Sequence, residues 1–503
     1  MLDSAPLKSP AVPAVTTAPA ATPPGAPQTR HLPWKNAGML MAITFSFLQM
    51  MNEVGALMSI PLYGQMSADL SLTPSQVTWA LMATTLMGSV SIAFLAKVGD
   101  IFGHRKVMYI CLGLIVVGFG VAALAPNLVT LVVGRALIGV MAGQALCVGI
   151  MNDRLSVAHR KRAVAYIAAG QAAGVFIGFA LGGAFVTSGL TWRHAFVFGG
   201  ILTLLSLIGF ALWGKDSDAI ERNRGQRKSI DVGGVLLLGL GLTALCIGIS
   251  QSMTWGLTSA PTLGFTLGGV VLLAAALYWE SKSPDPLLPI ADLFSRRLLP
   301  AYGVFISMGI PSMLLFNLVM GYAMTPADPV AYGFGLTPLQ AAFIFLPEVV
   351  AGFMAARLVT RWLALTAARN VLVGAGLLML ASFLALTFGH TSLYVVVVVV
   401  FFYGMAYTAL MTTAVSVIAV EAKEGKGAGT ASIYVAVALA ASSIGTAIYS
   451  AIAGWGTDPE TMALRPETFT VGFGVASVFT CVAIVCGLTL SRNLKLAQPD
   501  SAR

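Results

Sequence analysis

The chain has 503 residues, of which 57% are hydrophobic and only 10% are charged, and its mean hydropathy is +0.85. A soluble domain carries about a quarter charged residues, so this composition indicates a membrane protein. The formal net charge is +9, which in a soluble protein would suggest nucleic acid or another anionic partner. All five cysteines lie inside apolar runs without a Cys-x-x-Cys pair, which argues against disulfide bonds and against a zinc site.

The apolar runs begin after an unusual N-terminal stretch. Residues 1–36 are rich in proline, alanine and threonine, so we expect a disordered tail there, and they lack the pattern of a secretory signal. A helix needs about 20 apolar residues to cross a bilayer, and only helices can satisfy their own backbone in lipid. The sequence therefore predicts fourteen spanning helices, at 37–62, 76–96, 107–125, 128–151, 163–186, 194–213, 232–254, 261–280, 298–323, 337–356, 370–389, 392–419, 428–454 and 469–490.

The placement of lysine and arginine supports this count. If the N-terminal tail is cytoplasmic, every second gap between spans also faces the cytoplasm, and these gaps with the two tails hold 26 of the 29 basic residues. Arg193 and Arg465 fall outside this set, and Arg135 lies within a span. Such a bias is what the positive-inside rule predicts. It accounts for the net charge without nucleic acid, and it predicts that both termini are cytoplasmic.

The longest charged interval divides the chain after the sixth span. The last six spans mirror the first six, so the pair between them is predicted to be an insertion. We expect an all-α polytopic membrane protein organised as six, two and six helices. The predicted parts are a disordered cytoplasmic tail (1–36), an N-terminal six-helix bundle (37–213), a cytoplasmic loop (214–231), an inserted two-helix linker (232–281), a second cytoplasmic loop (282–297), a C-terminal six-helix bundle (298–490) and a cytoplasmic tail (491–503).

The loop between the second and third spans carries the pattern Gly99-Asp100-Ile-Phe-Gly103-His-Arg105-Lys106. Its glycines suit a tight turn, and its acidic and basic groups could pair across helices at the membrane face. A loop that only sets topology would need the basic residues alone. The pattern resembles the loop signature of the major facilitator superfamily, and the six-two-six layout resembles its fourteen-helix drug:proton antiporter group. The resemblance implies a conformational gate made by Gly99, Asp100, Gly103, Arg105 and Lys106.

In the fourth span, Arg135 with the glycines that follow resembles the second motif of this family. A charged side chain at this depth costs at least about 2.5 kcal/mol unless it faces a polar cavity or a partner. Arg135 lies about 10 Å inside the span, so its side chain could instead reach the membrane surface. We interpret it as functional.

The fifth span carries a stripe of glycines at four-residue spacing. This spacing places small residues on one helix face and lets another helix approach closely. The stripe resembles the family's antiporter motif, although Phe179 stands where that motif has proline. Plain tight packing is the alternative interpretation. The stripe consists of Gly170, Gly174, Gly178 and Gly182, followed by Gly183.

Two deep acids are candidates for proton coupling. The family's first-helix aspartate falls on Asn52, and the acid of this chain follows as Glu53; the deep acid of the second half is Glu348. Glu53 and Arg135 lie at similar depths, about 10–12 Å from the outer ends of their spans. In the family both helices face the first bundle's cavity, so we expect the two groups to meet there. Our hypothesis makes Glu53 the proton carrier, with Glu348 as the rival site.

The sequence has no Gly-x-x-x-x-Gly-Lys phosphate loop and no His-Glu-x-x-His motif. We therefore expect no cofactor, no metal and no enzyme activity. The resemblance implies a monomeric, proton-coupled exporter of small hydrophobic or amphipathic compounds in the cell membrane, working by alternating access. Two alternatives stay open: uptake by proton symport, and a sensor or scaffold built on the transporter fold. The sequence does not name the substrate.

Overall fold

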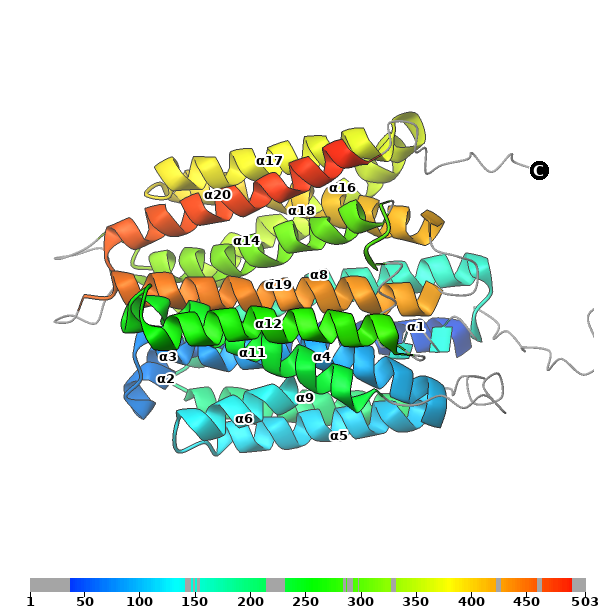
Figure 1. Ribbon diagram of the computed structural model, residues 1–503. Coiled ribbons are helices and arrows are strands. Elements are labelled where there is room, and N and C mark those ends of the chain that lie inside the picture. Colours follow the sequence, from blue (N-terminus) through cyan, green and yellow to red (C-terminus); the bar gives the residue numbers. More distant parts are fainter. Residues whose placement is uncertain are drawn as a thin grey trace, which may run out of the picture.

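The computed structural model describes residues 37–140, 146–147, 150–151, 154–213, 231–283, 286, 293–296, 298–326, 332–421, 427–458 and 464–490. Within these ranges the regular structure is helical, with one isolated bridge between Thr457 and Leu464. The long helices run side by side along one axis of the molecule (Figure 1). The prediction of an all-α polytopic membrane protein is confirmed. The predicted tails 1–36 and 491–503, and the loop 214–230, lie outside the described residues.

The first half of the chain builds one group of helices. Its elements are α1 (Met39–Leu57), η2 (Ile60–Leu62), α2 (Tyr63–Leu70), α3 (Pro74–Val77), α4 (Trp79–Phe102), α5 (His104–Ala123), α6 (Leu128–Ile138), α8 (Val157–Thr187) and α9 (Trp192–Trp213). α1 packs against α8 and α9, α5 packs against α6 and α9, and α4 packs against α6. These contacts bury apolar faces of the helices against one another.

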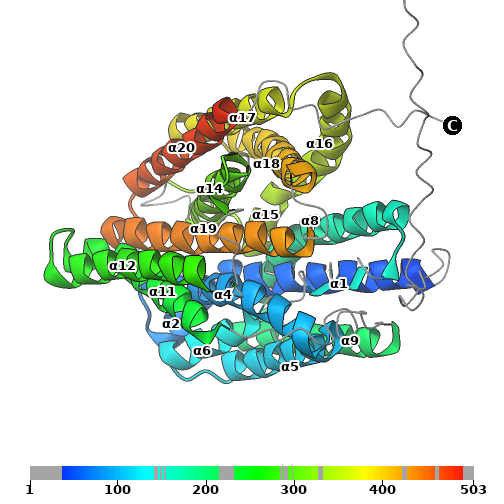
Figure 2. The same cartoon turned by 45° about the vertical axis from the view of Figure 1, so that its right-hand side comes forward.

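The second half builds a second group. Its elements are α14 (Leu299–Met324), α15 (Pro338–Ala342), η3 (Phe343–Phe345), α16 (Leu346–Leu365), α17 (Ala368–Gly389), α18 (Leu393–Glu421), α19 (Gly427–Gly456) and α20 (Pro466–Thr489). α14 packs against α19 and α20, while α17 and α16 both pack against α18. Figure 2 shows this group on one side of the molecule and α1, α5, α6 and α9 on the other, with α8 and α19 between them.

A helix pair connects the two groups. It consists of α11 (Val232–Trp255) and α12 (Ala260–Lys282), which pack on each other, and α11 also contacts both α4 and α19. Asp231 caps α11 by accepting from the Gly234 N–H at 2.8 Å, and it also accepts from Trp279 Nε1 of α12. Burial alone would raise the pKa of Asp231, but these hydrogen bonds and the charge of Lys97 hold it below its ordinary value. The pair therefore spans the line where the two groups meet.

The two halves repeat one local motif. Thr73 forms a capping box with Gln76 at the start of α3, and Thr337 forms the same box with Gln340 at the start of α15. In a capping box the Thr hydroxyl and the Gln side chain satisfy each other's free backbone N–H groups. Each motif reads Thr-Pro-x-Gln and leads into the second long helix of its group. The repeat agrees with the mirrored arrangement that the sequence predicts.

The two groups meet mainly where α4 lies against α19 and where α8 lies against α15. The hydroxyls of Ser75 and Ser450 are 2.8 Å apart, and Ser443 Oγ donates to Thr85 Oγ1 at 2.9 Å. On the α8 side, the Phe179 ring stacks on Phe345 with a centroid distance of 4.6 Å. Hydroxyl pairs and ring contacts therefore join the groups, without an ion pair at these positions.

Eleven helices in the described ranges are long and apolar enough to cross a membrane. The number is twelve if the segments Pro74–Ile92 and Phe94–Phe102, bent by 42°, form one span. The predicted span 128–151 begins with α6, and residues 141–145 and 148–149 of it lie outside the description, whereas the predicted span 163–186 lies within α8. The count of fourteen and the bundle boundaries therefore stay predictions.

Candidate functional site

Arg135 is completely buried, with 0% of its surface exposed. Its Nη1 donates to the Gly55 carbonyl at 2.6 Å, and its Nη2 donates to the Ala56 carbonyl at 2.9 Å and to Ser59 Oγ at 3.1 Å. Its Nε donates to the Ala80 carbonyl at 3.2 Å. Four hydrogen bonds to α1, α4 and the turn after α1 thus satisfy the charge inside the protein. The side chain does not reach toward the membrane surface.

These acceptors exist because α1 ends here. The helix stops at Leu57, and Pro61 in the following η2 has no N–H to continue the pattern. The last carbonyls of a helix lack partners and carry its partial negative charge. A guanidinium satisfies both the hydrogen bonds and the charge. Arg135 therefore acts as a cap on the broken end of α1.

Glu53 lies on α1, and its carboxyl faces α8 rather than Arg135. Gln171 Nε2 of α8 donates to Glu53 Oε1 at 2.9 Å. The backbone of Gly174 lies so close that an added Cβ would be 2.8 Å from the Cβ of Glu53. Within the described ranges the structure records no ion pair between Glu53 and Arg135. The expected contact is therefore wrong in this structure, because equal depth along two helices does not place their side chains on facing sides.

Glu348 lies in the first turn of α16, directly after Pro347. The backbone of Gly404 in α18 packs against it, since an added Cβ at Gly404 would be 2.7 Å from the Glu348 carbonyl oxygen. The Oε2 atom of Glu348 is buried and accepts no hydrogen bond from the part of the chain that is described. A carboxyl group buried in this way is costly to ionise.

The sequence analysis missed two residues beside these acids. Gln171 holds Glu53, and Tyr407 lies on the same face of α18 as Gly404, whose backbone packs against Glu348. Tyr407 follows Tyr403 by one helical turn inside a valine-rich span, and their ring centroids are 5.9 Å apart. Two tyrosines one turn apart in a strongly apolar helix are a signal that could have been noticed.

The glycine stripe of α8 packs against α1. A Cβ at Gly174 would lie 2.6 Å from the Met50 carbonyl, and one at Gly182 would overlap the Met58 carbonyl. Gly170 and Gly178 face α1 in the same way, whereas Gly183 faces the backbone of Leu339 in α15. The stripe therefore brings α8 close to α1 along its length, and this close approach places Gln171 beside Glu53.

Phe179 occupies the position of the missing motif proline. Its ring is completely buried and contacts both Phe345 and Phe316 of the second half, at centroid distances of 4.6 and 5.4 Å. α8 continues unbroken past this position, because phenylalanine keeps the backbone hydrogen bond that proline would remove. The residue therefore serves the contact between the two groups.

The predicted gate loop is a sharp corner between α4 and α5. Gly103 has a φ of +96°, a conformation that favours glycine, and a Cβ at Gly99 would lie 3.2 Å from the His104 ring. Asp100 Oδ1 lies 3.4 Å from Nε2 of the buried His104. Arg105 donates to the Ala211 carbonyl of α9 at 3.4 Å. The corner is thus tied to a neighbouring helix, and its last basic residue, Lys106, is exposed.

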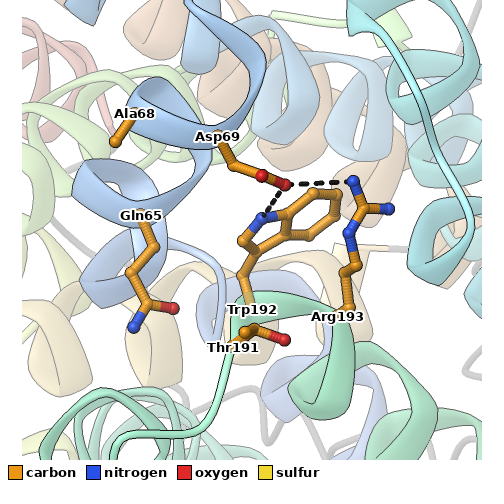
Figure 3. A pocket seen from close by; sticks show the side chains of 6 residues that line it. All are labelled: Gln65, Ala68, Asp69, Thr191, Trp192 and Arg193. Atoms are coloured by element: carbon orange, nitrogen blue, oxygen red, sulfur yellow. Dashed lines mark hydrogen bonds and ion pairs between the residues drawn. The ribbon is translucent and has the colours of Figure 1, made fainter.

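A second polar cluster lies at the other end of the first group (Figure 3). Asp69 Oδ2 accepts from Arg193 Nη2 at 3.0 Å and from Trp192 Nε1 at 3.1 Å. Arg193 Nη1 donates to the carbonyls of Ala123 and Ala125. These bonds tie the ends of α2, α5 and α9 together and give Arg193 acceptors inside the protein. The cluster borders a hollow of about 480 Å³, lined by Gln65, Ala68, Asp69, Thr191, Trp192 and Arg193.

Two groups of long apolar helices, each with a buried acid inside it, are typical of a polytopic membrane transporter. Comparison with known proteins identifies the family. The sequence profile of the Major Facilitator Superfamily matches residues 43–446, and the chain belongs to this superfamily. The predicted family is confirmed, and because the family and the relatives are transporters, the prediction that the chain is not an enzyme is confirmed too.

The similar sequences include resistance proteins. The puromycin resistance protein pur8 of Streptomyces alboniger is 29% identical over 63% of this chain and 61% of that protein. The lincomycin resistance protein of Streptomyces lincolnensis is 26% identical over 54% of each chain. The putative multidrug resistance protein MdtD of Serratia proteamaculans is 24% identical over 68% of this chain and 69% of that protein. The chain thus spans about half to three fifths of the length of the first two relatives.

Solved structures show the same fold. A peptide transporter POT in complex with sulfate superposes with a TM-score of 0.61 at 16% identity, covering 90% of this chain and 95% of that one. The human organic anion transporter MFSD10 (TETRAN) gives a TM-score of 0.58 at 16% identity, covering 88% of this chain and 99% of that one.

Proposed function

We propose that this protein is a proton-coupled secondary transporter that exports small hydrophobic or amphipathic compounds across the cell membrane. It works as a monomer with both termini in the cytoplasm. The two bundles rock about their interface so that a central site faces each side of the membrane in turn.

The observation that carries this proposal is the carboxyl of Glu53 within an apolar helix. An ionisable group at membrane depth is costly and marks a functional pathway by default. Glu53 has a neutral partner, Gln171, instead of a cation. A carboxyl without a counter-ion can hold a proton and release it when its surroundings change, whereas a salt-bridged one would stay ionised. We place the transported proton on Glu53, with Glu348 as the second site.

The contacts between the bundles also support alternating access. Hydroxyl pairs such as Ser75 with Ser450 can exchange their partners for water at little cost when the bundles separate. The resistance proteins among the relatives favour export as the direction and antibiotic-like compounds as the cargo.

Everted membrane vesicles from cells producing the protein provide the test. Puromycin, lincomycin and a panel of hydrophobic amines are offered with and without a proton gradient, beside vesicles lacking the protein. We expect gradient-dependent accumulation of at least one compound inside the vesicles. Right-side-out vesicles are measured in parallel, and accumulation only in these would indicate uptake by symport. If no compound moves under any condition, the export proposal fails and a sensor or scaffold becomes the better explanation.

A further inference from the structure

The helix pair α11–α12 lies over the seam between the two bundles. We use the word seam for the contact of α4 and the preceding α3 with α19, which contains the hydroxyl pairs Thr85–Ser443 and Ser75–Ser450. α11 packs against both α4 and α19. Figure 1 and Figure 2 both show the pair beside these two helices. If the seam opens, α11 must therefore lose its contact with one of them.

The two helices of the pair are packed closely through glycines. A Cβ at Gly241 of α11 would lie 2.9 Å from the backbone nitrogen of Leu273, and one at Gly269 of α12 would lie 2.5 Å from that of Leu245. Small residues in such positions let helix backbones approach each other closely. The pair therefore moves as one unit.

α11 lies mainly against α19. Ala447 of α19 is completely buried in one apolar cluster with Leu242 and Cys246 of α11. In the last turn of α11, Thr254 lies beside Gly454, where an added Cβ would be 3.5 Å from the Thr254 Oγ1 atom. The contact thus extends from the middle of α11 to its end.

The contact of α11 with α4 is smaller. Met82 and Leu86 of α4 belong to the same buried cluster. Val90 lies one turn further along α4, and a Cβ at Gly239 of α11 would be 3.6 Å from both of its methyl carbons. The smaller of the two contacts is the one that opening of the seam breaks more readily.

A separate bond holds the other end of the pair. Lys97 Nζ of α4 donates to the Pro286 carbonyl, beyond the end of α12, at 3.5 Å. Lys97 lies about 18 Å along the chain of α4 from Thr85 at the helical rise. This bond can therefore persist as a pivot while the seam opens around Thr85.

We propose, on the basis of the alternating access in the function above, that the α11–α12 pair is a clamp that moves with α19 and holds the seam closed by packing on α4 around Val90. Contacts that exist in only one state shift the equilibrium toward that state. The packing of α11 on α4 is lost when the seam opens, so it stabilises the closed seam. The inserted pair thus regulates how often the bundles separate.

Two disulfide cross-links compare the contacts in the full-length protein without its five native cysteines. Val90→Cys with Gly239→Cys joins α11 to α4, and Thr254→Cys with Gly454→Cys joins α11 to α19; both glycines have room for a Cβ. Copper phenanthroline oxidises each pair. Every protein also carries Ser443→Cys, a completely buried seam position. The readout is the rate at which a water-soluble maleimide modifies this cysteine, measured by mass spectrometry.

The disulfide between α11 and α4 should slow this modification at least about tenfold, a change typical of conformational coupling. The disulfide between α11 and α19 should leave the rate unchanged, and reduction before labelling should restore the rate of the first variant. Equal slowing by both cross-links, or slowing by the α19 cross-link alone, overturns the proposal.

Gly239→Phe tests the clamp without a disulfide. A ring at this position pushes α11 away from Val90 and should raise the rate of modification by about fivefold. Gly264→Phe on α12 is the matched control, since a Cβ there meets nothing within 4 Å. Thermal unfolding and gel filtration identify variants that fail to fold. Equal rates in the two folded variants overturn the clamp.

Failure of the export proposal gives a different pattern. The cross-links then act as expected on Ser443→Cys, which supports the clamp, but vesicles accumulate no compound. If Ser443→Cys reacts in the protein without cross-links and neither disulfide slows it, the clamp is wrong while bundle movement stands. If it never reacts, the seam does not open and the clamp is overturned with it.

Discussion

Arg135 donates to the Gly55 carbonyl at 2.6 Å, two residues along α1 from Glu53, yet it forms no ion pair with that acid in the described structure. The arginine is thus a fixed part of the scaffold on one side of α1, and the acid faces α8 on another. This separation leaves the Glu53 carboxyl without a strong counter-ion. Under the proposed function, fixing the broken helix end and binding a proton are tasks for different residues.

Replacement of Arg135 by lysine should destabilise the protein. A lysine ammonium cannot reproduce the fork of donors that reaches Gly55, Ala56 and Ala80 together. Loss of two such bonds to a charged group should lower the free energy of unfolding by about 3 kcal/mol. Unfolding in detergent micelles measures this, with Arg361→Lys on the exposed face of α16 as the control. Equal stability of the two variants would contradict the capping role.

The glycine stripe predicts a sharp contrast between two alanine substitutions. Gly182→Ala places a methyl group against the Met58 carbonyl and should force α8 away from α1, at a cost of about 1–3 kcal/mol. Gly120→Ala on α5 meets nothing within 4 Å and should be neutral or slightly stabilising, because alanine favours a helix. Paired unfolding measurements decide this. If both variants unfold alike, the close approach of the helices does not contribute to stability.

The helices were predictable because a run of about 20 apolar residues in lipid has no other way to satisfy its backbone. The partners of Arg135 were not, since they depend on where α1 breaks, and Pro61 predicts a break without showing which helix faces it. The prediction of a contact between Glu53 and Arg135 was wrong for a related reason. The depth of a residue along a helix follows from its number, whereas the side that it faces depends on how the neighbouring helices pack. The contact of Gln171 with Glu53 became apparent only when α8 was placed against α1.

The gate loop predicts a functional defect without a folding defect. Asp100→Asn removes one half-exposed charge beside His104 and changes little buried area. Transport should fall by about tenfold, a change typical of conformational coupling energies, while the amount of protein in the membrane stays near normal. Glu467→Gln at the exposed start of α20 is the control. Normal transport by the Asp100 variant would indicate that the loop only sets topology, since acidic residues contribute little to orientation.

The distribution of basic residues predicts the topology. Single cysteines at Ser4 and Thr457, in a protein whose five native cysteines have been replaced, should react with a membrane-impermeant thiol reagent from opposite sides. The expected result is labelling of Thr457→Cys in intact cells and of Ser4→Cys only after the membrane is opened. Labelling of both from the same side would require an even number of spans between them and would rule out the layout of fourteen helices.

The assignment of the transported proton to Glu53 leads to the last prediction. Glu53→Gln keeps the shape of the side chain and a hydrogen-bonding group for Gln171, but an amide cannot take up or release a proton in this range. Accumulation against a gradient should therefore disappear, with the ratio of internal to external compound falling to about one. Exchange of labelled for unlabelled compound should continue, since it needs bundle movement without net proton transfer. Proteoliposomes containing each variant, with Glu467→Gln as the control, allow both measurements on one preparation. If Glu53→Gln still accumulates compound while Glu348→Gln does not, the proton belongs to the second bundle and the assignment to α1 is wrong.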